Sequence, residues 1–197
     1  MSSSPREIGT LVLWHSLKVL SHGVKTGGQY HPRPVGVSGW VKAELGTSMA
    51  WTQLETTTHQ DHVIAHVLGA TVLGWFVAGE AAHLLLDIGF LWTIYLDGEM
   101  NLLPQGVAIP ELDADELSSA DKTELAFDAQ LLLDEGCDAI GLKRFIVSPV
   151  KCSIIAAEVF AANSKRRILI QGETAIIRVE ASLETSEMDV VADQSAS

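Results

Sequence analysis

The chain has 197 residues, of which 47% are hydrophobic and 19% are charged, and its formal net charge is −12. This length and composition are typical of a folded domain with a sizeable core, and they exclude a chain that is disordered throughout. Because acidic side chains repel phosphate groups, we expect neither nucleic acid nor an anionic membrane surface as a partner.

The charges are unevenly distributed along the chain. Residues 1–42 hold five basic and one acidic side chain, residues 43–121 hold twelve acidic and no basic ones, and residues 122–197 hold eight basic and twelve acidic ones. The basic cluster Lys165-Arg166-Arg167 falls where we predict a hairpin turn. We interpret it as a solvated turn rather than an anion site.

The N-terminal third begins with a predicted helix. Ser4 and Glu7 have the spacing of a capping box, and Gly23 is placed to end the helix. After a loop rich in glycine and proline, we expect a short helix over residues 38–45 and a strand over residues 48–58.

The stretch from Asp61 to Leu103 holds most of the apolar residues. Its many β-branched side chains favour a buried strand over residues 62–77, followed by a short helix over 80–87 and a strand over 90–96. A continuous apolar run does not distinguish a buried strand from a buried helix, so a single helix over residues 61–79 stays an alternative.

The dipeptide Asp97-Gly98 lies between two apolar runs. This pattern predicts a hairpin with a type I′ turn, because that turn needs positive φ at both central residues.

Residues 63–79 carry no permanent charge. The length of this uncharged run is close to that of a transmembrane helix. Three glycines interrupt this run, at positions 69, 74 and 79, and no lysine or arginine flanks it. We therefore expect no membrane span, since the basic flanks that orient such helices are missing.

The last part of the chain predicts one helix and a meander of strands. Ser118 or Ser119 is placed to cap a helix over residues 118–135, which Gly136 would end. Three β-rich runs follow, and the last one alternates from Ala175 to Leu183, with one face toward a core and one toward water. We interpret residues 184–197 as a flexible acidic tail.

Together these elements predict an α+β fold in a single domain over residues 1–183. The sheet would be antiparallel or mixed, with the central hairpin and the C-terminal meander as its parts. The N-terminal helix and the 118–135 helix would pack on it.

The cysteines are too few for a disulfide framework. Cys137 and Cys152 are the two cysteines present, and the first residues do not resemble a signal peptide. We expect a reduced cytoplasmic setting, with both thiols acting as small buried side chains.

One group of residues has the composition of a metal site. His59, Asp61, His62 and His66 fall within eight residues, and imidazole with carboxylate suits zinc or another divalent transition metal. The alternative is structural: Asp61 would cap the following element, while His62 and His66 would be partly buried and hydrogen-bonded.

The run Thr58-His59-Gln60-Asp61-His62 resembles the second half of the His-x-His-x-Asp-His signature of the metallo-β-lactamase fold. That resemblance implies a zinc pair that activates water for hydrolysis. Thr57 stands in place of the first histidine, and no histidine follows His83. We therefore do not assign the chain to that family.

Three functions remain. The hydrophobic excess favours a non-enzymatic ligand-binding or self-assembling protein, expected to be a homo-oligomer. The second is a metal-dependent hydrolase that uses the cluster at 59–66, with a metal-bound water as nucleophile. The third is a structural subunit of a larger assembly, with the apolar surface as its interface.

Overall fold

The structure, a computed structural model, describes residues 50–112 and 114–194. The helix predicted from Ser4 to Gly23 and the short helix over residues 38–45 lie outside these residues. Of the strand expected over residues 48–58, the described part contains only β1, Thr52–Gln53.

The described residues form a sheet of nine strands accompanied by three α-helices. The helices are α1 (Thr58–Val67), α2 (Gln105–Glu111) and α3 (Ser119–Glu135), with a 3-10 turn at Gly136–Asp138. The strands after β1 are β2 (Thr71–Ala78), β3 (Ala81–Leu86), β4 (Phe90–Tyr95), β5 (Met100–Pro104), β6 (Ile146–Ala162), β7 (Lys165–Gly172), β8 (Ala175–Ser182) and β9 (Met188–Gln194). The predicted α+β class with an antiparallel sheet is confirmed.

The long strand β6 belongs to both halves of the sheet. The strand order is β5-β4-β3-β2-β6-β7-β8-β9, and β1 also pairs with β6. The first part of β6 pairs with β2, where Trp75 lies opposite Ile146, and its later part pairs with β7. The two halves of the sheet therefore share one continuous backbone.

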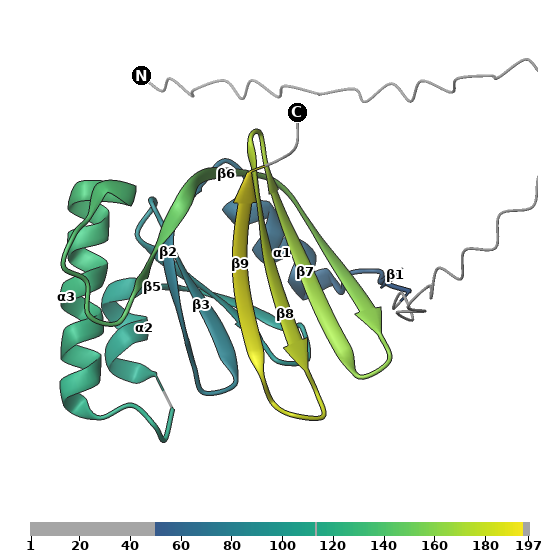
Figure 1. Ribbon diagram of the computed structural model, residues 1–197, viewed down its shortest axis with the longest axis horizontal. Coiled ribbons are helices and arrows are strands. Elements are labelled where there is room, and N and C mark those ends of the chain that lie inside the picture. Colours follow the sequence, from purple (N-terminus) through teal and green to yellow (C-terminus); the bar gives the residue numbers. More distant parts are fainter. Residues whose placement is uncertain (1–49, 113, 195–197) are drawn as a thin grey trace, which may run out of the picture. The chain divides into compact units, whose positions relative to one another are not determined.

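Two apolar cores lie on opposite faces of the β2–β5 half of the sheet. One core lies between this half, the β6–β9 half and α1, with Trp92, Leu84 and Ile170 fully buried in it. The other lies between the β2–β5 half and the two helices α2 and α3. Figure 1 shows α2 and α3 together on one side of β2 and β3, with β7–β9 on the other side.

The prediction of a helix over residues 80–87 is wrong, because this segment is strand β3. All six residues of β3 are buried, since both faces of the strand are covered by a core. A strand covered on both faces reads as a continuous apolar run instead of an alternating one, which removes the usual signal.

The strand predicted over residues 62–77 begins too early. Its first part is helix α1, which Thr57 caps in a capping box with Gln60, and only Thr71–Ala78 is strand. The local cap outweighs the weak helix propensity of the β-branched residues. The alternative of one helix over 61–79 is also wrong, since the helix ends at Val67.

The hairpin predicted at Asp97-Gly98 is confirmed, but its turn type is not. Of these two residues only Gly98 has a positive φ, +97°. Residues with positive φ at both central positions occur instead at Gly79 and Glu80, which join β2 to β3 with φ of 58° and 56°. The positive-φ pair that a type I′ turn needs is therefore two hairpins earlier than the sequence indicates.

The C-terminal predictions are mostly confirmed. Ser118 caps α3, Gly136 ends it, and β6, β7 and β8 form the meander. Residues 188–194, which we interpreted as part of a flexible tail, form the additional strand β9 instead. Val190 and Ala192 of this strand pack against the first core, so its burial outweighs the acidic composition.

The buried carboxylate of Asp128 connects α3 to the start of β6. Its Oδ2 accepts the backbone N–H groups of Lys143 at 2.9 Å, Arg144 at 2.6 Å and Phe145 at 3.1 Å. Asp128 itself is 0% exposed. Hydrogen bonds to a charged acceptor are stronger than neutral ones, so this carboxylate fixes where β6 begins.

We expect Asp128→Ala to lower the free energy of unfolding by roughly 3 kcal/mol, because three amides lose a charged acceptor. Asp128→Asn keeps one acceptor oxygen and should cost roughly half as much. Urea denaturation followed by circular dichroism measures both. Asp134→Ala, which removes an exposed carboxylate of the same helix, serves as the control, and an equal loss in this variant would contradict the role of Asp128.

Candidate functional site

A partly enclosed hollow lies between α2 and the strands β2–β5. Its volume is about 300 Å³. Its lining comprises Ala78, Gly79, Ala81, His83, Thr93, Tyr95, Leu103, Ala108, Glu111, Leu112 and Ala114. Most of these residues are apolar, and a few polar groups converge among them, which is the usual composition of a small-molecule site. We call it the His83 hollow.

Neighbouring strands and a short helix position the polar groups of the hollow. His83 on β3 and Thr93 on β4 are cross-strand partners, so their side chains point to the same face. Phe76 on β2 stacks on the imidazole ring, with 4.6 Å between ring centroids. The ring orientation of His83 is therefore fixed from two sides.

The hydrogen bonds of His83 define its tautomer. Nε2 lies 3.2 Å from the carbonyl oxygen of Ala78, which only accepts, so Nε2 carries the proton and donates. Nδ1 is then the acceptor, and the hydroxyl of Thr93 donates to it at 3.0 Å. Both ring nitrogens are occupied, so His83 has no free nitrogen to offer a substrate or a metal.

Burial keeps His83 neutral. The side chain is 3% exposed, and its desolvation lowers the pKa from 6.5 to about 4, although the bond to the Ala78 carbonyl acts in the opposite direction. A buried imidazolium would lack water as a solvating partner. At neutral pH the inner part of the hollow is therefore polar but uncharged.

Carboxylates supply the charge around the hollow. Glu111, at the end of α2, is the one charged side chain of the described residues that lines it. Nearby, Glu116 accepts the N–H of Gly79 at 2.6 Å. The phenol of Tyr95 also lines the hollow and accepts a hydrogen bond from Asn101 at 3.1 Å. This arrangement attracts cations and repels anions.

His59, the first residue of the proposed metal cluster, makes a structural contact. It lies on α1, and its Nε2 donates to the carbonyl oxygen of Met100 on β5 at 2.9 Å. The side-chain oxygen of Asn101 lies at 3.4 Å from the same nitrogen. His59 therefore attaches α1 to the edge of the sheet.

The other members of the cluster point to different partners. Asp61 accepts a hydrogen bond from the hydroxyl of Thr56, and Nδ1 of His66 donates to the carbonyl oxygen of His62 at 2.6 Å. Asp61, His62 and His66 are all exposed, so the alternative with partly buried histidines is wrong. Thr57, not Asp61, provides the N-cap.

The four predicted ligands are not gathered around a common point. Across residues 50–112 and 114–194, no group of three or more histidine, cysteine or acidic side chains is arranged to hold a metal ion. Shared spacing on a short helix brings the residues to one region, but ligation also requires their donor atoms to converge.

Gln60, which the sequence did not single out, is the buried polar residue of α1. Its amide nitrogen donates to the carbonyl oxygen of Gly98 at 2.9 Å, and its amide oxygen accepts the N–H of Thr57 at 2.8 Å. The Thr-x-x-Gln spacing of a capping box was the available signal. Gln60 thus connects the start of α1 to the β4–β5 turn.

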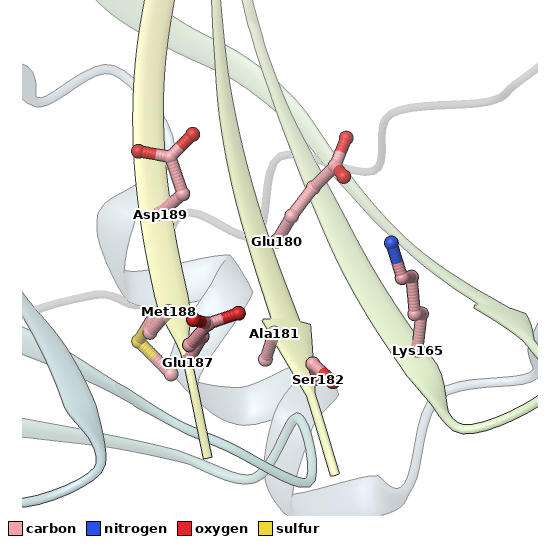
Figure 2. Close-up of a pocket in the computed structure, with 7 residues that line it drawn as sticks. All are labelled: Lys165, Glu180, Ala181, Ser182, Glu187, Met188 and Asp189. Atoms are coloured by element: carbon pink, nitrogen blue, oxygen red, sulfur yellow. The ribbon is translucent and has the colours of Figure 1, made fainter. Parts of the chain in front are cut away.

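A second, more open hollow lies over the ends of β7, β8 and β9. Its volume is about 410 Å³. Figure 2 shows its residues on three strands, with Lys165 on β7, Glu180 on β8 and Asp189 on β9. Glu180 is already paired with Arg167 at 2.6 Å and Arg178 at 3.0 Å. This surface combines charged side chains with the apolar side chains of Ala181 and Met188.

Both cysteines are free. Cys152 is buried and Cys137 is partly buried, and burial raises the pKa of each thiol. A raised pKa lowers the thiolate fraction, so neither side chain has the character of a nucleophile.

Comparison with protein-family models, curated proteins and solved structures finds no match to this chain. Within residues 50–112 and 114–194, no helix has both the length and the apolar character needed to cross a bilayer. The described residues form an α+β domain with an antiparallel sheet and a partly enclosed hollow that Glu111 helps to line.

The buried, neutral state of His83 makes stability depend on pH. Its pKa is about 4 in the folded chain and 6.5 when exposed, so between these values the unfolded chain binds a proton that the folded chain does not. The free energy of unfolding should therefore fall as the pH is lowered from 6.5 to 4, with His83 contributing up to about 3 kcal/mol.

Urea denaturation of the wild type and of His83→Gln across this pH range measures that contribution. Glutamine keeps a donor and an acceptor but does not titrate, and the carboxylates titrate equally in both proteins. The variant should show a shallower pH dependence. Parallel curves for the two proteins would contradict the buried neutral histidine.

Proposed function

We propose that this protein is a non-enzymatic binding domain whose ligand is a small apolar molecule with a cationic amino group. The observation that carries this proposal is the His83 hollow, whose described lining is mainly apolar and includes one charged side chain, Glu111. Its volume, about 300 Å³, is at the lower end of the range of small-molecule sites.

The chemistry of the lining favours binding over catalysis. His83 is neutral and uses both ring nitrogens, and the hydroxyl of Thr93 is committed to donating to it. These two side chains, which could otherwise serve as base and nucleophile, therefore have no free acceptor or donor for a substrate. The lining groups with room to interact are Glu111, the exposed phenol of Tyr95 and the apolar wall.

Isothermal titration with benzylamine tests the proposal, because this probe has an apolar ring and a cationic amine. We expect a dissociation constant on the order of 1 mM, which is reasonable for so small a ligand. Benzoate, the matched anion, should not bind. Glu111→Gln should weaken benzylamine binding by roughly fivefold.

A second variant locates the ligand. Leu103 lines the hollow and is 45% exposed, so Leu103→Trp should narrow the hollow without disturbing the core. This variant should lose benzylamine binding and keep its circular dichroism spectrum. Equal binding of benzylamine and benzoate, or full binding by Leu103→Trp, would contradict the proposal.

Exposed apolar side chains favour self-assembly as a second function. Phe127 on α3 is 62% exposed, and Ile140, in the segment that follows α3, is 85% exposed. The bonds from Asp128 to residues 143–145 hold that segment alongside α3. Aromatic and aliphatic side chains that are exposed in a single chain become buried when two copies associate.

Light scattering tests self-assembly. The wild type should have a mass of at least two chains of 21.2 kDa each, and the double variant Phe127→Ser with Ile140→Ser should be a monomer. Leu68, the C-cap residue of α1, is also apolar and exposed. Leu68→Ser therefore serves as the control and should leave the mass unchanged. A monomeric wild type at all concentrations would rule out this function.

A further inference from the structure

The main strand order ends in the edge strands β5 and β9, and the two-residue β1 lies off this order beside β6. An edge strand presents backbone N–H and C=O groups that have no partner within the sheet, and these groups pair readily with another extended chain. The edges at β5 and β9 differ in how many of their outward backbone groups already form hydrogen bonds.

The hydrogen bonds of the β4–β5 hairpin show which groups of β5 point outward. The N–H of Tyr95 donates to the carbonyl oxygen of Glu99 at 2.8 Å. Because bonding alternates along an antiparallel ladder, the backbone groups of Met100, Leu102 and Pro104 point away from β4.

This β5 edge is protected. His59 of α1 donates to the carbonyl oxygen of Met100, and Pro104 has no N–H to offer. Only Leu102 keeps both groups on the outer side. The β5 edge is therefore short and blocked at both ends, as is usual for a sheet edge that must not pair.

The outer edge of β9 is longer, and its backbone groups are not bonded to other described elements. The N–H of Ser182 on β8 donates to the carbonyl oxygen of Glu187 at 2.9 Å, which sets the alternation along this hairpin. The residues whose backbone groups point away from β8 are Met188, Val190, Ala192 and Gln194. Among the described residues, no backbone hydrogen bond from another element reaches these groups.

The side chains of β9 indicate what would fit beside it. Met188, Val190 and Ala192 pack against the first core, so the inward side chains of an added strand would cover apolar surface. Asp189 and Asp193 are exposed on the other face, and neither forms an ion pair within residues 50–112 and 114–194. An added strand would therefore gain from basic side chains on its outer face.

The hollow in Figure 2 lies beside Asp189 at the start of β9, and Glu187 is also part of its lining. Its volume of about 410 Å³ leaves room for a long side chain of an added strand. Lysine and arginine have the length to place an apolar stem there and a charged end beside the carboxylates.

We propose that the edge of β9 binds an extended basic segment of another protein by strand addition. The segment has two lysine or arginine residues four positions apart, which face Asp189 and Asp193, and apolar residues at the two inward positions between them. Backbone hydrogen bonds give affinity, and the charge pairs give specificity.

A second copy of this chain fits the edge less well. An antiparallel pairing of two β9 strands that uses the whole edge is centred on Val191, and it places Asp189 of each copy opposite Asp193 of the other. Like charges directly opposite each other destabilise such a pair. The acidic character of this edge therefore selects a basic partner.

Fluorescence anisotropy with the full chain and a labelled peptide tests the proposal. The probe is Gly-Lys-Val-Thr-Val-Lys-Gly, in which the lysines point outward and the valines inward. We expect a dissociation constant on the order of 100 μM at low salt. The peptide with N-methylated valines keeps the charge but loses two amide donors, and it should bind at least roughly tenfold more weakly.

Variants of β9 locate the binding edge. The N–H of Ala192 points outward, so Ala192→Pro should abolish peptide binding without breaking the β8–β9 ladder. The double variant Asp189→Asn with Asp193→Asn should weaken binding by roughly fivefold and reduce its salt dependence. Thermal denaturation monitors whether each variant stays folded.

Three results would overturn the proposal. Equal binding of the N-methylated and unmodified peptides would mean that charge alone holds the peptide. Undiminished peptide binding by a folded Ala192→Pro variant would mean that the peptide binds at another site. A fall in molecular mass by light scattering on Ala192→Pro would identify a second copy as the occupant of this edge.

Discussion

The buried carboxylate of Asp128 is the interaction on which the arrangement of the two sheet halves depends. It accepts three consecutive backbone amides just before β6, and β6 is the strand that both halves share. Gly74 of β2 is adapted to the same junction, because a Cβ at this position would lie 2.6 Å from the carbonyl oxygen of Ile146. The acidic residue and the glycine together determine how closely β2 and β6 approach, and so how the second half of the sheet lies over the first.

Two of the described histidines, His59 and His83, have structural roles, although the number of histidines in the sequence first indicates metal chemistry. His59 occupies the carbonyl oxygen of Met100 at the β5 edge, and His83 lies neutral in the wall of the hollow with both nitrogens bonded. In each case Nε2 donates to a backbone carbonyl oxygen, and this bond fixes the tautomer of the ring. The features with unused binding capacity are elsewhere, at the carboxylate of Glu111 and along the backbone of β9.

Local signals predicted those parts of the fold that depend on a few neighbouring residues. The cap at Ser118, the stop at Gly136 and the alternation from Ala175 to Ala181 are each set within a short stretch, and the structure confirms them. The strand β3 was missed because its burial on both faces depends on elements far away in the sequence. The His83 hollow was missed for the same reason, since Glu111 and His83 are brought together only by the packing of α2 on the sheet. Spacing could group the residues at 59–66, but it could not show that their donor atoms point to different partners.

The shared strand β6 also has a consequence for synthesis of the chain on the ribosome. Strands β2–β5 emerge first, and α2 and α3 follow them directly, so one face of this half-sheet can be covered early. The opposite face carries Trp75, Leu84 and Trp92, and until β6–β9 have been made, α1, which precedes β2, is the one described element that can cover part of it. During that interval the nascent chain exposes an apolar sheet face, which is the kind of surface that chaperones bind and that leads to aggregation. Chains that terminate before β9 would keep part of this face exposed permanently.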